Sequence, residues 1–255
     1  MPTSEAPLAP APAFAGTSAF VRTEVLVQKN ERLAMATSMV VQSVILVFVW
    51  ILNPGPLGVA FVGAILFSTF TMGQRVLNEA AYLRIDHKAN DLYLAGPLSP
   101  EAYFLGMSAG ILLVYFTPVA ALWILAYFVV HYSLGVAALL LSVSALVWLS
   151  AASIGYIFST FFRDNRAIWA YATLFFNVFG VLPPVFYPFD RFPHYLQPVA
   201  LVMPPSAAAA LVQHAIGATS LSTGQIELAA TSLAVEAVLL FLFAIYWARR
   251  TVQER

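Results

Sequence analysis

The chain has 255 residues, of which 61% are hydrophobic and 9% are charged, and its mean hydropathy is +0.83. A soluble globular domain carries roughly 25% charged residues, so this composition excludes such a domain and predicts an integral membrane protein. The formal net charge is zero and cysteine is absent. The composition therefore indicates no nucleic-acid partner, no disulfide framework and no thiolate metal site.

The first segment, residues 1–16, is rich in Pro and Ala and lacks both a basic start and a continuous apolar run. It therefore fits neither a signal peptide nor a membrane span, and we expect a disordered cytoplasmic tail. Residues 17–32 interleave apolar and charged side chains, a pattern typical of a helix that lies in the headgroup layer of the membrane.

Long apolar stretches follow, and a helix needs about 20 such residues to cross a hydrocarbon core of about 30 Å. The sequence predicts an all-α membrane protein with six transmembrane helices, over residues 33–52, 57–74, 102–130, 134–162, 167–185 and 228–248. The turn sequence at residues 53–56 separates the first two. Pro118 lies inside the third span, where we expect it to kink the helix.

The basic residues divide unevenly between the two sides of the membrane. If six spans alternate from a cytoplasmic N-terminus, the inner side receives every Lys and Arg except Arg191. Cytoplasmic loops collect Lys and Arg, so this partition supports the number of spans and predicts that both termini lie in the cytoplasm. We expect the chain to lie in the cell membrane.

The outer segment, residues 185–227, is too apolar for a solvated loop and too often interrupted by Pro for one straight helix. Irregular backbone at membrane depth is tolerated only where protein or a water-filled cavity satisfies its polar groups. We therefore predict a re-entrant helical hairpin between the fifth and sixth spans. A simple extracellular cap is the alternative.

The chemistry of a nucleotide-hydrolysing enzyme is missing from the sequence. A phosphate-binding loop ends in Gly-Lys-Ser/Thr, whereas the two lysines, Lys29 and Lys88, follow Gln28 and His87. The four histidines lack the spacing of metal or haem ligands. We expect no catalytic residue, no metal and no cofactor on this chain, so any ATP-driven work must come from another polypeptide.

Glu236 is the one ionisable residue well inside a predicted span, and a bare carboxylate there is costly. It is the leading single-residue functional candidate, and Asn177 is a weaker one. The alternative is a protonated or hydrogen-bonded Glu at a helix contact. The pairs Gly106 and Gly110, and Ala151 and Gly155, have the small-xxx-small spacing that lets helix backbones approach closely.

The inner segment, residues 75–100, is predicted as a short helix followed by a stop. A mixed polar and apolar face, which a soluble partner could grip, recurs there at steps of three and four residues. Its members are Glu79, Tyr82, Leu83, Asp86, Asn90 and Leu94. A self-contained connecting loop is the alternative.

Three features resemble the permease subunits of type 2 ATP-binding cassette (ABC-2) exporters, over residues 17–255. The inner segment closes on Ala95-Gly96-Pro97-Leu98-Ser99-Pro100-Glu101, similar to the Gly-Pro-Leu-Ser closure of that family. The stretch from Gly180 to Pro205 is similar to the family's Pro-rich outer element. An amphipathic inner helix followed by six spans is the third feature.

The resemblance implies that two permease chains, identical or related, assemble with a separate ATPase that binds ATP and Mg. Residues 75–100 would then be the coupling segment, and the outer hairpins would act as a lid. The implied outer gate comprises Pro183, Pro184, Tyr187, Pro188 and Pro193. The chain itself would be a transport subunit in contact with membrane lipids and not an enzyme.

Two other functions stay open. A proton-coupled secondary transporter using Glu236 is the first, although such folds show internal repeats and no second copy of this segment is evident. A non-transporting membrane anchor is the second. The apolar and aromatic spans favour an amphipathic or lipid-like cargo, and the plentiful Tyr and Phe leave a polysaccharide possible.

Overall fold

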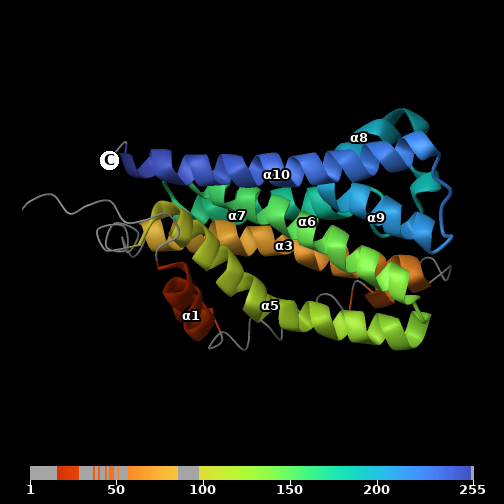
Figure 1. The fold of residues 1–255 in the computed structure, drawn as a ribbon, viewed down its shortest axis with the longest axis horizontal. Coiled ribbons are helices and arrows are strands. Elements are labelled where there is room, and N and C mark those ends of the chain that lie inside the picture. Colours follow the sequence, from red (N-terminus) through yellow and green to blue (C-terminus); the bar gives the residue numbers. More distant parts are fainter. Residues whose placement is uncertain are drawn as a thin grey trace, which may run out of the picture.

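The computed structural model describes residues 16–28, 57–85 and 98–253, together with scattered helical positions between residues 37 and 51. The predicted tail up to residue 15 and most of the first predicted span lie outside these residues. All regular structure in the described part is helical (Figure 1). The elements are α1 (Thr17–Gln28), α3 (Leu57–Ile85), α5 (Pro100–Val130), α6 (Leu134–Ser159), α7 (Asn165–Val181), η1 (Phe189–Arg191), η2 (His194–Leu196), α8 (Gln197–Val202), α9 (Pro204–Ala215) and α10 (Thr223–Gln253).

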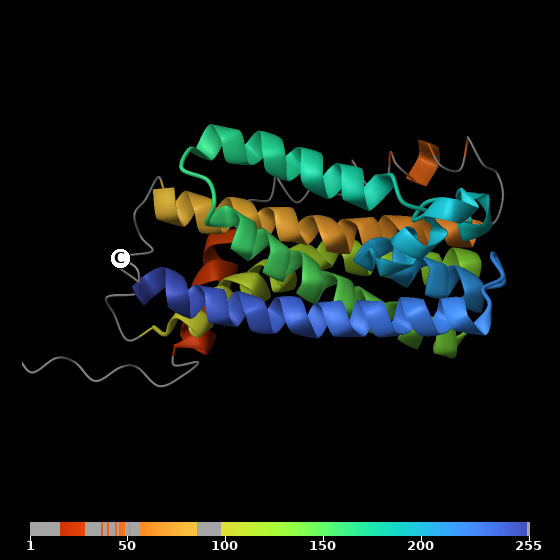
Figure 2. The same ribbon diagram turned by 90° about the horizontal axis from the view of Figure 1, so that it is seen from above.

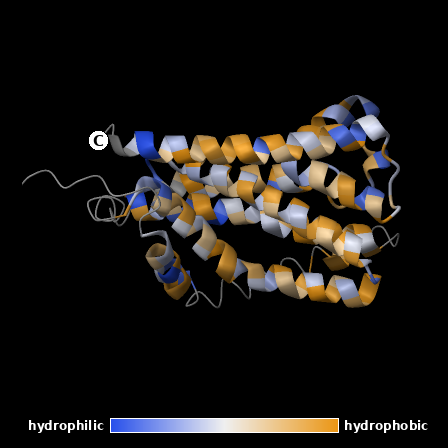
Figure 3. Ribbon diagram, in the orientation of Figure 1, coloured by the Kyte–Doolittle hydropathy of each residue, from blue (hydrophilic) through white to orange (hydrophobic). Residues whose placement is uncertain are grey.

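Four helices of the described chain, α3, α5, α6 and α10, are long and apolar enough to cross a membrane. They run along the long axis of the molecule (Figures 1 and 2), and hydrophobic residues extend along them (Figure 3). The most apolar window of α3 is 83% buried, against 22–33% for the other three helices. Helix α3 is therefore the central helix, and the others expose apolar faces as lipid-facing helices do.

Helix α3 does not end where the sequence predicted. We expected the second span to stop at Gln74 and a separate short helix to follow, but α3 continues unbroken to Ile85. Residues 75–85 contain neither Pro nor Gly, and Val76, Leu77, Ala80 and Ala81 on this part of α3 are buried in the bundle. Packing of these residues therefore stabilises the helix beyond the charged position at Arg75.

The predicted number of six spans is not reached in the described chain. Helix α7, over the fifth predicted span, has 17 residues, which at about 1.5 Å per residue is shorter than a hydrocarbon core of about 30 Å. Within the described residues, a fifth crossing exists only if His194–Val202 and Pro204–Ala215, which meet at a bend of 107°, count as one broken span. This bent pair occupies the segment for which the sequence predicted a re-entrant hairpin.

Glycines set the closest helix contacts. A Cβ atom on Gly155 of α6 would collide with the backbone oxygen of Gly73 of α3, and one on Gly73 would collide with that of Ala151. On α5, a Cβ on Gly106 would lie 2.8 Å from Cδ1 of Phe20 of α1. The close approach predicted from both small-xxx-small pairs is confirmed.

Helix α1 lies across the bundle near the end that holds the C-terminus (Figure 1). It packs on α5, with Phe20, Glu24 and Gln28 buried and with Leu26 and Val27 about half exposed. The outward apolar side chains suit a helix in the headgroup layer. Helix α5 changes direction along its length (Figure 1), and Pro118 inside it removes a backbone donor, as expected for a kink.

Candidate functional site

One face of the central helix α3 is polar. Ser68, Thr71, Arg75 and Asn78 recur at steps of three and four residues, which places them on one side of the helix. We call these four residues the polar stripe. Gly73, on another side of α3, makes the backbone contact with α6. The polar stripe turns toward α5 and α7, which also pack on α3.

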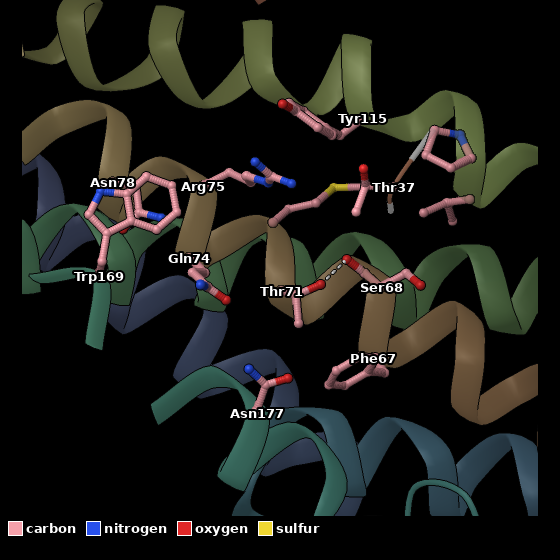
Figure 4. Close-up of a pocket in the computed structure, with 13 residues that line it drawn as sticks. Thr37, Phe67, Ser68, Thr71, Gln74, Arg75, Asn78, Tyr115, Trp169 and Asn177 are labelled. Carbon is pink, nitrogen blue, oxygen red and sulfur yellow. Dashed lines mark hydrogen bonds between the residues drawn. The ribbon is translucent and has the colours of Figure 1, made fainter. Parts of the chain in front are cut away.

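The polar stripe lines a cleft of about 240 Å³ between α3, α5 and α7, which we call the polar cleft (Figure 4). Tyr115 and Val119 contribute from α5, and Trp169 and Asn177 contribute from α7. The remaining described lining residues are Thr37, Phe67, Met72, Gln74 and Pro118. The structure therefore places Asn177, one of the two intramembrane candidates from the sequence, at a polar site.

Arg75 is the cationic group of the polar cleft. Its side chain reaches from α3 toward α5 (Figure 4), and its guanidinium carbon lies 4.7 Å from the centroid of the Tyr115 ring. At about 1.5 Å per residue, Arg75 lies about 27 Å along α3 from Leu57. This position is near the end of a crossing of about 30 Å, and charged side chains on a spanning helix are retained mainly at ion or substrate pathways or near the membrane surface, so Arg75 makes the cleft a candidate functional site.

Several polar side chains of the cleft use their hydrogens within their own helices. The Ser68 hydroxyl donates to the Ala64 carbonyl oxygen at 2.6 Å, and the Thr71 hydroxyl donates to that of Ser68 at 2.9 Å. The Asn177 amide donates to the Thr173 carbonyl oxygen at 2.7 Å. The lone pairs of these hydroxyl and amide oxygens remain as acceptors in the cleft.

Asn78 adds a buried acceptor. Its side chain is only 7% exposed, and its Oδ1 atom has no hydrogen-bond partner in the part of the chain that the structure describes. A buried amide oxygen without a donor costs about 1–3 kcal/mol, so a ligand hydrogen at this point would be favourable.

Glu236 lines a different cavity, so the structure does not bring it together with Asn177. The half-buried Glu236 faces a space of about 500 Å³ between α7, α10 and the bend from α8 to α9. The other described lining residues are apolar: Phe70, Ile154, Phe175, Phe179, Val199, Val202, Met203, Pro204, Pro205, Leu239 and Leu240. Among the described residues, no hydrogen bond or ion pair engages its carboxylate.

The predicted outer gate follows α7 at the end of the bundle that carries α8. Pro183 and Pro184 are buried, Tyr187 and Pro188 are half-buried, and Pro193 is exposed. Sequence reasoning missed the residue that holds this segment, Gln213 of α9.

Gln213 is fully buried and forms hydrogen bonds with the backbone of the outer segment. Its amide nitrogen donates to the carbonyl oxygens of Pro184, Val185 and Tyr187 at 3.1–3.4 Å, and its oxygen accepts from the backbone N–H of Phe189 at 3.0 Å. The only signal for this role in the sequence is one Gln within an otherwise Ala-rich apolar helix.

Of the predicted coupling residues, Asp86, Asn90 and Leu94 lie outside the described residues. Tyr82 is exposed and Leu83 is half-buried in the last turns of α3. Glu79 accepts a hydrogen bond from the Gln28 side chain of α1 at 3.1 Å. Tyr82 and Leu83 are thus placed near the end of α3, whereas Glu79 takes part in the contact with α1.

Arginine side chains connect helix ends near the C-terminus through hydrogen bonds and an ion pair. Arg84 of α3 donates to the carbonyl oxygens of Ser159, Thr160 and Phe162, which closes the C-terminal end of α6. Arg249 of α10 forms an ion pair with Glu101 at the start of α5. We call this end of the bundle the basic end, with Arg84, Arg163, Arg249 and Arg250. These contacts join α3 to α6 and α5 to α10 at this end.

Sequence reasoning also missed Arg75 and Asn78 as a site, because it took Arg75 as the point where a span ends. The regular spacing of Ser68, Thr71, Arg75 and Asn78 was the signal that could have shown one polar helix face. Within the described residues, no group of three or more His, Cys, Asp or Glu side chains could hold a metal ion.

In a comparison with known families, residues 17–216 match the family described as ABC-2 type transporter. This region includes α1, the polar cleft and the whole outer segment up to α9. No curated protein matches the chain.

Proposed function

Because the chain belongs to the family of ABC-2 type transporter membrane domains, we propose that it forms the translocation path of an ATP-driven exporter together with a second permease chain. It is a multi-pass membrane protein, and its family consists of transmembrane permeases that work with an ABC ATPase. The observation that carries the proposal is the polar cleft in an otherwise apolar bundle, because a permease must offer polar groups to its cargo at membrane depth.

The coupling to the ATPase runs through residues 75–100. Tyr82 and Leu83 lie on the same continuous helix as Arg75 and Asn78. A movement of the ATPase that displaces the end of α3 therefore also displaces the wall of the polar cleft. A packed helix moves as a rigid element, and the close contact at Gly73 carries the motion to α6. Asp86, Asn90 and Leu94 complete the coupling surface in this proposal.

The outer gate closes the opposite end of the path. Pro183, Pro184, Tyr187, Pro188 and Pro193 cover this end in the proposal, and the hydrogen bonds from Gln213 support a gate that moves as one piece with α9. The basic end faces the cytoplasm together with both termini, because Lys and Arg collect on that side of a membrane.

The test is co-purification of an ATPase encoded next to this chain. We expect the intact chain to retain the ATPase and a chain with residues 86–94 replaced by a Gly/Ser linker to lose it. Tyr82→Ala should reduce the retained ATPase several-fold, since exposed aromatic residues anchor protein interfaces. Tyr195→Ala is the matched control, because Tyr195 is an exposed tyrosine at the gate end.

The opposite result would be transport by a chain that retains no ATPase. The proton-coupled alternative would then take its place, with Glu236 as the proton carrier, and Glu236→Gln should abolish transport driven by a proton gradient. Transport that needs the ATPase and tolerates dissipation of that gradient removes the alternative.

A further inference from the structure

We propose that the polar cleft binds the anionic, hydroxyl-bearing head group of an amphipathic substrate, with Arg75 binding the anion and Asn78 accepting a hydrogen bond from a hydroxyl group. This proposal rests on the proposed function, since it names the cargo class of the same permease.

The described residues that line the polar cleft carry a net positive charge. Arg75 is the only charged residue among the described residues that line the polar cleft. Its stacking on Tyr115 uses the face of the guanidinium, whereas the N–H groups donate in the guanidinium plane. One arginine can therefore stack on a ring and bind a phosphate or carboxylate at the same time.

The hydrogen-bonding capacity indicates that the ligand also supplies hydrogens. Ser68, Thr71 and Asn177 donate to backbone carbonyls and leave oxygen lone pairs in the cleft, and Oδ1 of the buried Asn78 has no donor among the described residues. A sulfate or chloride ion offers only acceptors at neutral pH and would leave Asn78 unsatisfied. Hydroxyl groups next to the anion satisfy these oxygens.

The remaining lining and the size indicate an amphipathic ligand. Phe67, Met72 and Val119 make part of the lining apolar, and Trp169 is about half exposed. The volume of about 240 Å³ is below the range of about 300–1,000 Å³ that is usual for drug-sized ligands. The cleft therefore suits one head group, with an apolar tail outside it.

The cavity at Glu236 fits this class less well. It is larger, its other described lining residues are apolar, and its one ionisable group among the described residues is a carboxyl group, which offers no positive charge to an anion and repels it when ionised. The anionic head group is thus assigned to the polar cleft alone.

The experiment measures lipid binding to the full-length permease in nanodiscs, with its ATPase where that co-purifies. Native mass spectrometry compares phosphatidylglycerol, which carries a phosphate and hydroxyls, with phosphatidic acid, which lacks the glycerol hydroxyls, and with zwitterionic phosphatidylcholine. Soluble glycerol 1-phosphate is added as a competitor. We expect phosphatidylglycerol to bind at least about tenfold more tightly than phosphatidylcholine, the loss that one charged hydrogen bond would cause.

Two variants separate the two contacts. Arg75→Gln should remove the preference for both anionic lipids. Asn78→Ala should weaken the binding of phosphatidylglycerol several-fold and leave the binding of phosphatidic acid unchanged. Arg75→Lys keeps the charge without the planar fork and should retain part of the preference, which preserves the test if Arg75→Gln does not fold. Arg163→Gln, at an exposed arginine of the basic end, is the matched control and should bind as the parent does.

If glycerol 1-phosphate displaces the lipid, the cleft accepts the head group from a soluble compound. If it does not, the ligand is a membrane lipid. Either result supports the proposal. A folded Arg75 variant that keeps the full preference, or a parent chain that shows none, overturns the proposal. Such a result leaves the permease function intact, because that function is decided separately by retention of the ATPase.

Discussion

Glu24 lies where α1 meets the bundle, and its side chain is only 3% exposed. Its pKa is raised from 4.5 to about 7, mainly by burial and also by the negative charge of Glu79 on α3, while a hydrogen bond with Gln28 acts in the opposite direction. Its Oε2 atom has no hydrogen-bond partner in the described structure. The attachment of α1 therefore includes a carboxyl group that favours its protonated form.

We predict that the protein loses stability as the pH rises through this range. A carboxyl group with a raised pKa binds its proton more tightly in the folded state, so the free energy of unfolding falls between about pH 4.5 and about pH 7 and is level above. Thermal unfolding at pH 5, 6, 7 and 8 should show this fall in the parent and a smaller one in Glu24→Gln.

Glu227→Gln provides the control, because Glu227 is an exposed glutamate of α10. It should keep the slope of the parent. Glu79→Gln should move the fall to lower pH, since removing the neighbouring negative charge eases ionisation of Glu24. An unchanged slope in Glu24→Gln would mean that another group dominates the pH dependence.

At the scale of the elements, the contact between α3 and α6 depends on glycine. Gly73 and Gly155 meet backbone to backbone, and a backbone neighbour cannot turn aside as a flexible side chain can. The same two helices make the most extensive element contact among the described residues. The position of the polar stripe relative to α5 and α7 depends on this crossing.

We predict that Gly155→Leu separates α3 from α6. Overpacking costs typically about 1–3 kcal/mol where side chains can adjust, and the cost is larger where they meet backbone. The melting temperature in detergent should fall by at least about 5 °C, at about 2–4 °C per kcal/mol. Gly224→Leu, on a helical glycine with open space around it, is the matched control and should melt near the parent. A Gly155→Leu variant that melts at the same temperature as the parent would contradict the close backbone contact between α3 and α6.

The same element shows where sequence patterns reach their limit. The hydropathy pattern predicted a span over residues 57–74, and α3 contains it. The pattern also predicted a break at Arg75, because a charged residue usually ends an apolar run. The helix continues, since Leu77 and Ala81 on the far side of Arg75 find buried positions and Tyr115 of α5 receives the guanidinium.

At the scale of the whole molecule, the two ends of the bundle differ in charge. The basic end holds Arg84, Arg163, Arg249 and Arg250, and the gate end holds Arg191. The polar cleft lies between these ends, on the central helix that extends from one toward the other (Figure 1). The proposed path thus has a coupling end and a gate end.

We predict that the basic end faces the cytoplasm. The chain contains no cysteine, so single cysteines can be introduced without removing others. Ser220→Cys, at an exposed position near the gate end, should react with a membrane-impermeant maleimide on intact cells. Arg163→Cys should react only after the cells are permeabilised. The reverse pattern of labelling would invert the proposed orientation and place the coupling segment outside.

The sequence alone established the membrane class, the helical fold, the family and the contrast in charge along the chain. It also located the irregular outer segment, where the structure has helices that meet at 107°. These features follow from local properties, because hydropathy, charge and proline act on the residues next to them. The role of the coupling residues and of Glu236 stays a prediction.

Which polar groups share a site follows from the packing of the helices and could not be predicted from the sequence. Arg75 and Asn177 are far apart in sequence and line one cleft, whereas Asn177 and Glu236 line separate cavities. Gln213 holds a segment more than twenty residues before it, as its bond to the N–H of Phe189 shows. Such partnerships depend on which helix faces meet, and the rotation of each helix is set by close contacts such as Gly73 against Gly155, which a periodic pattern along one helix does not contain.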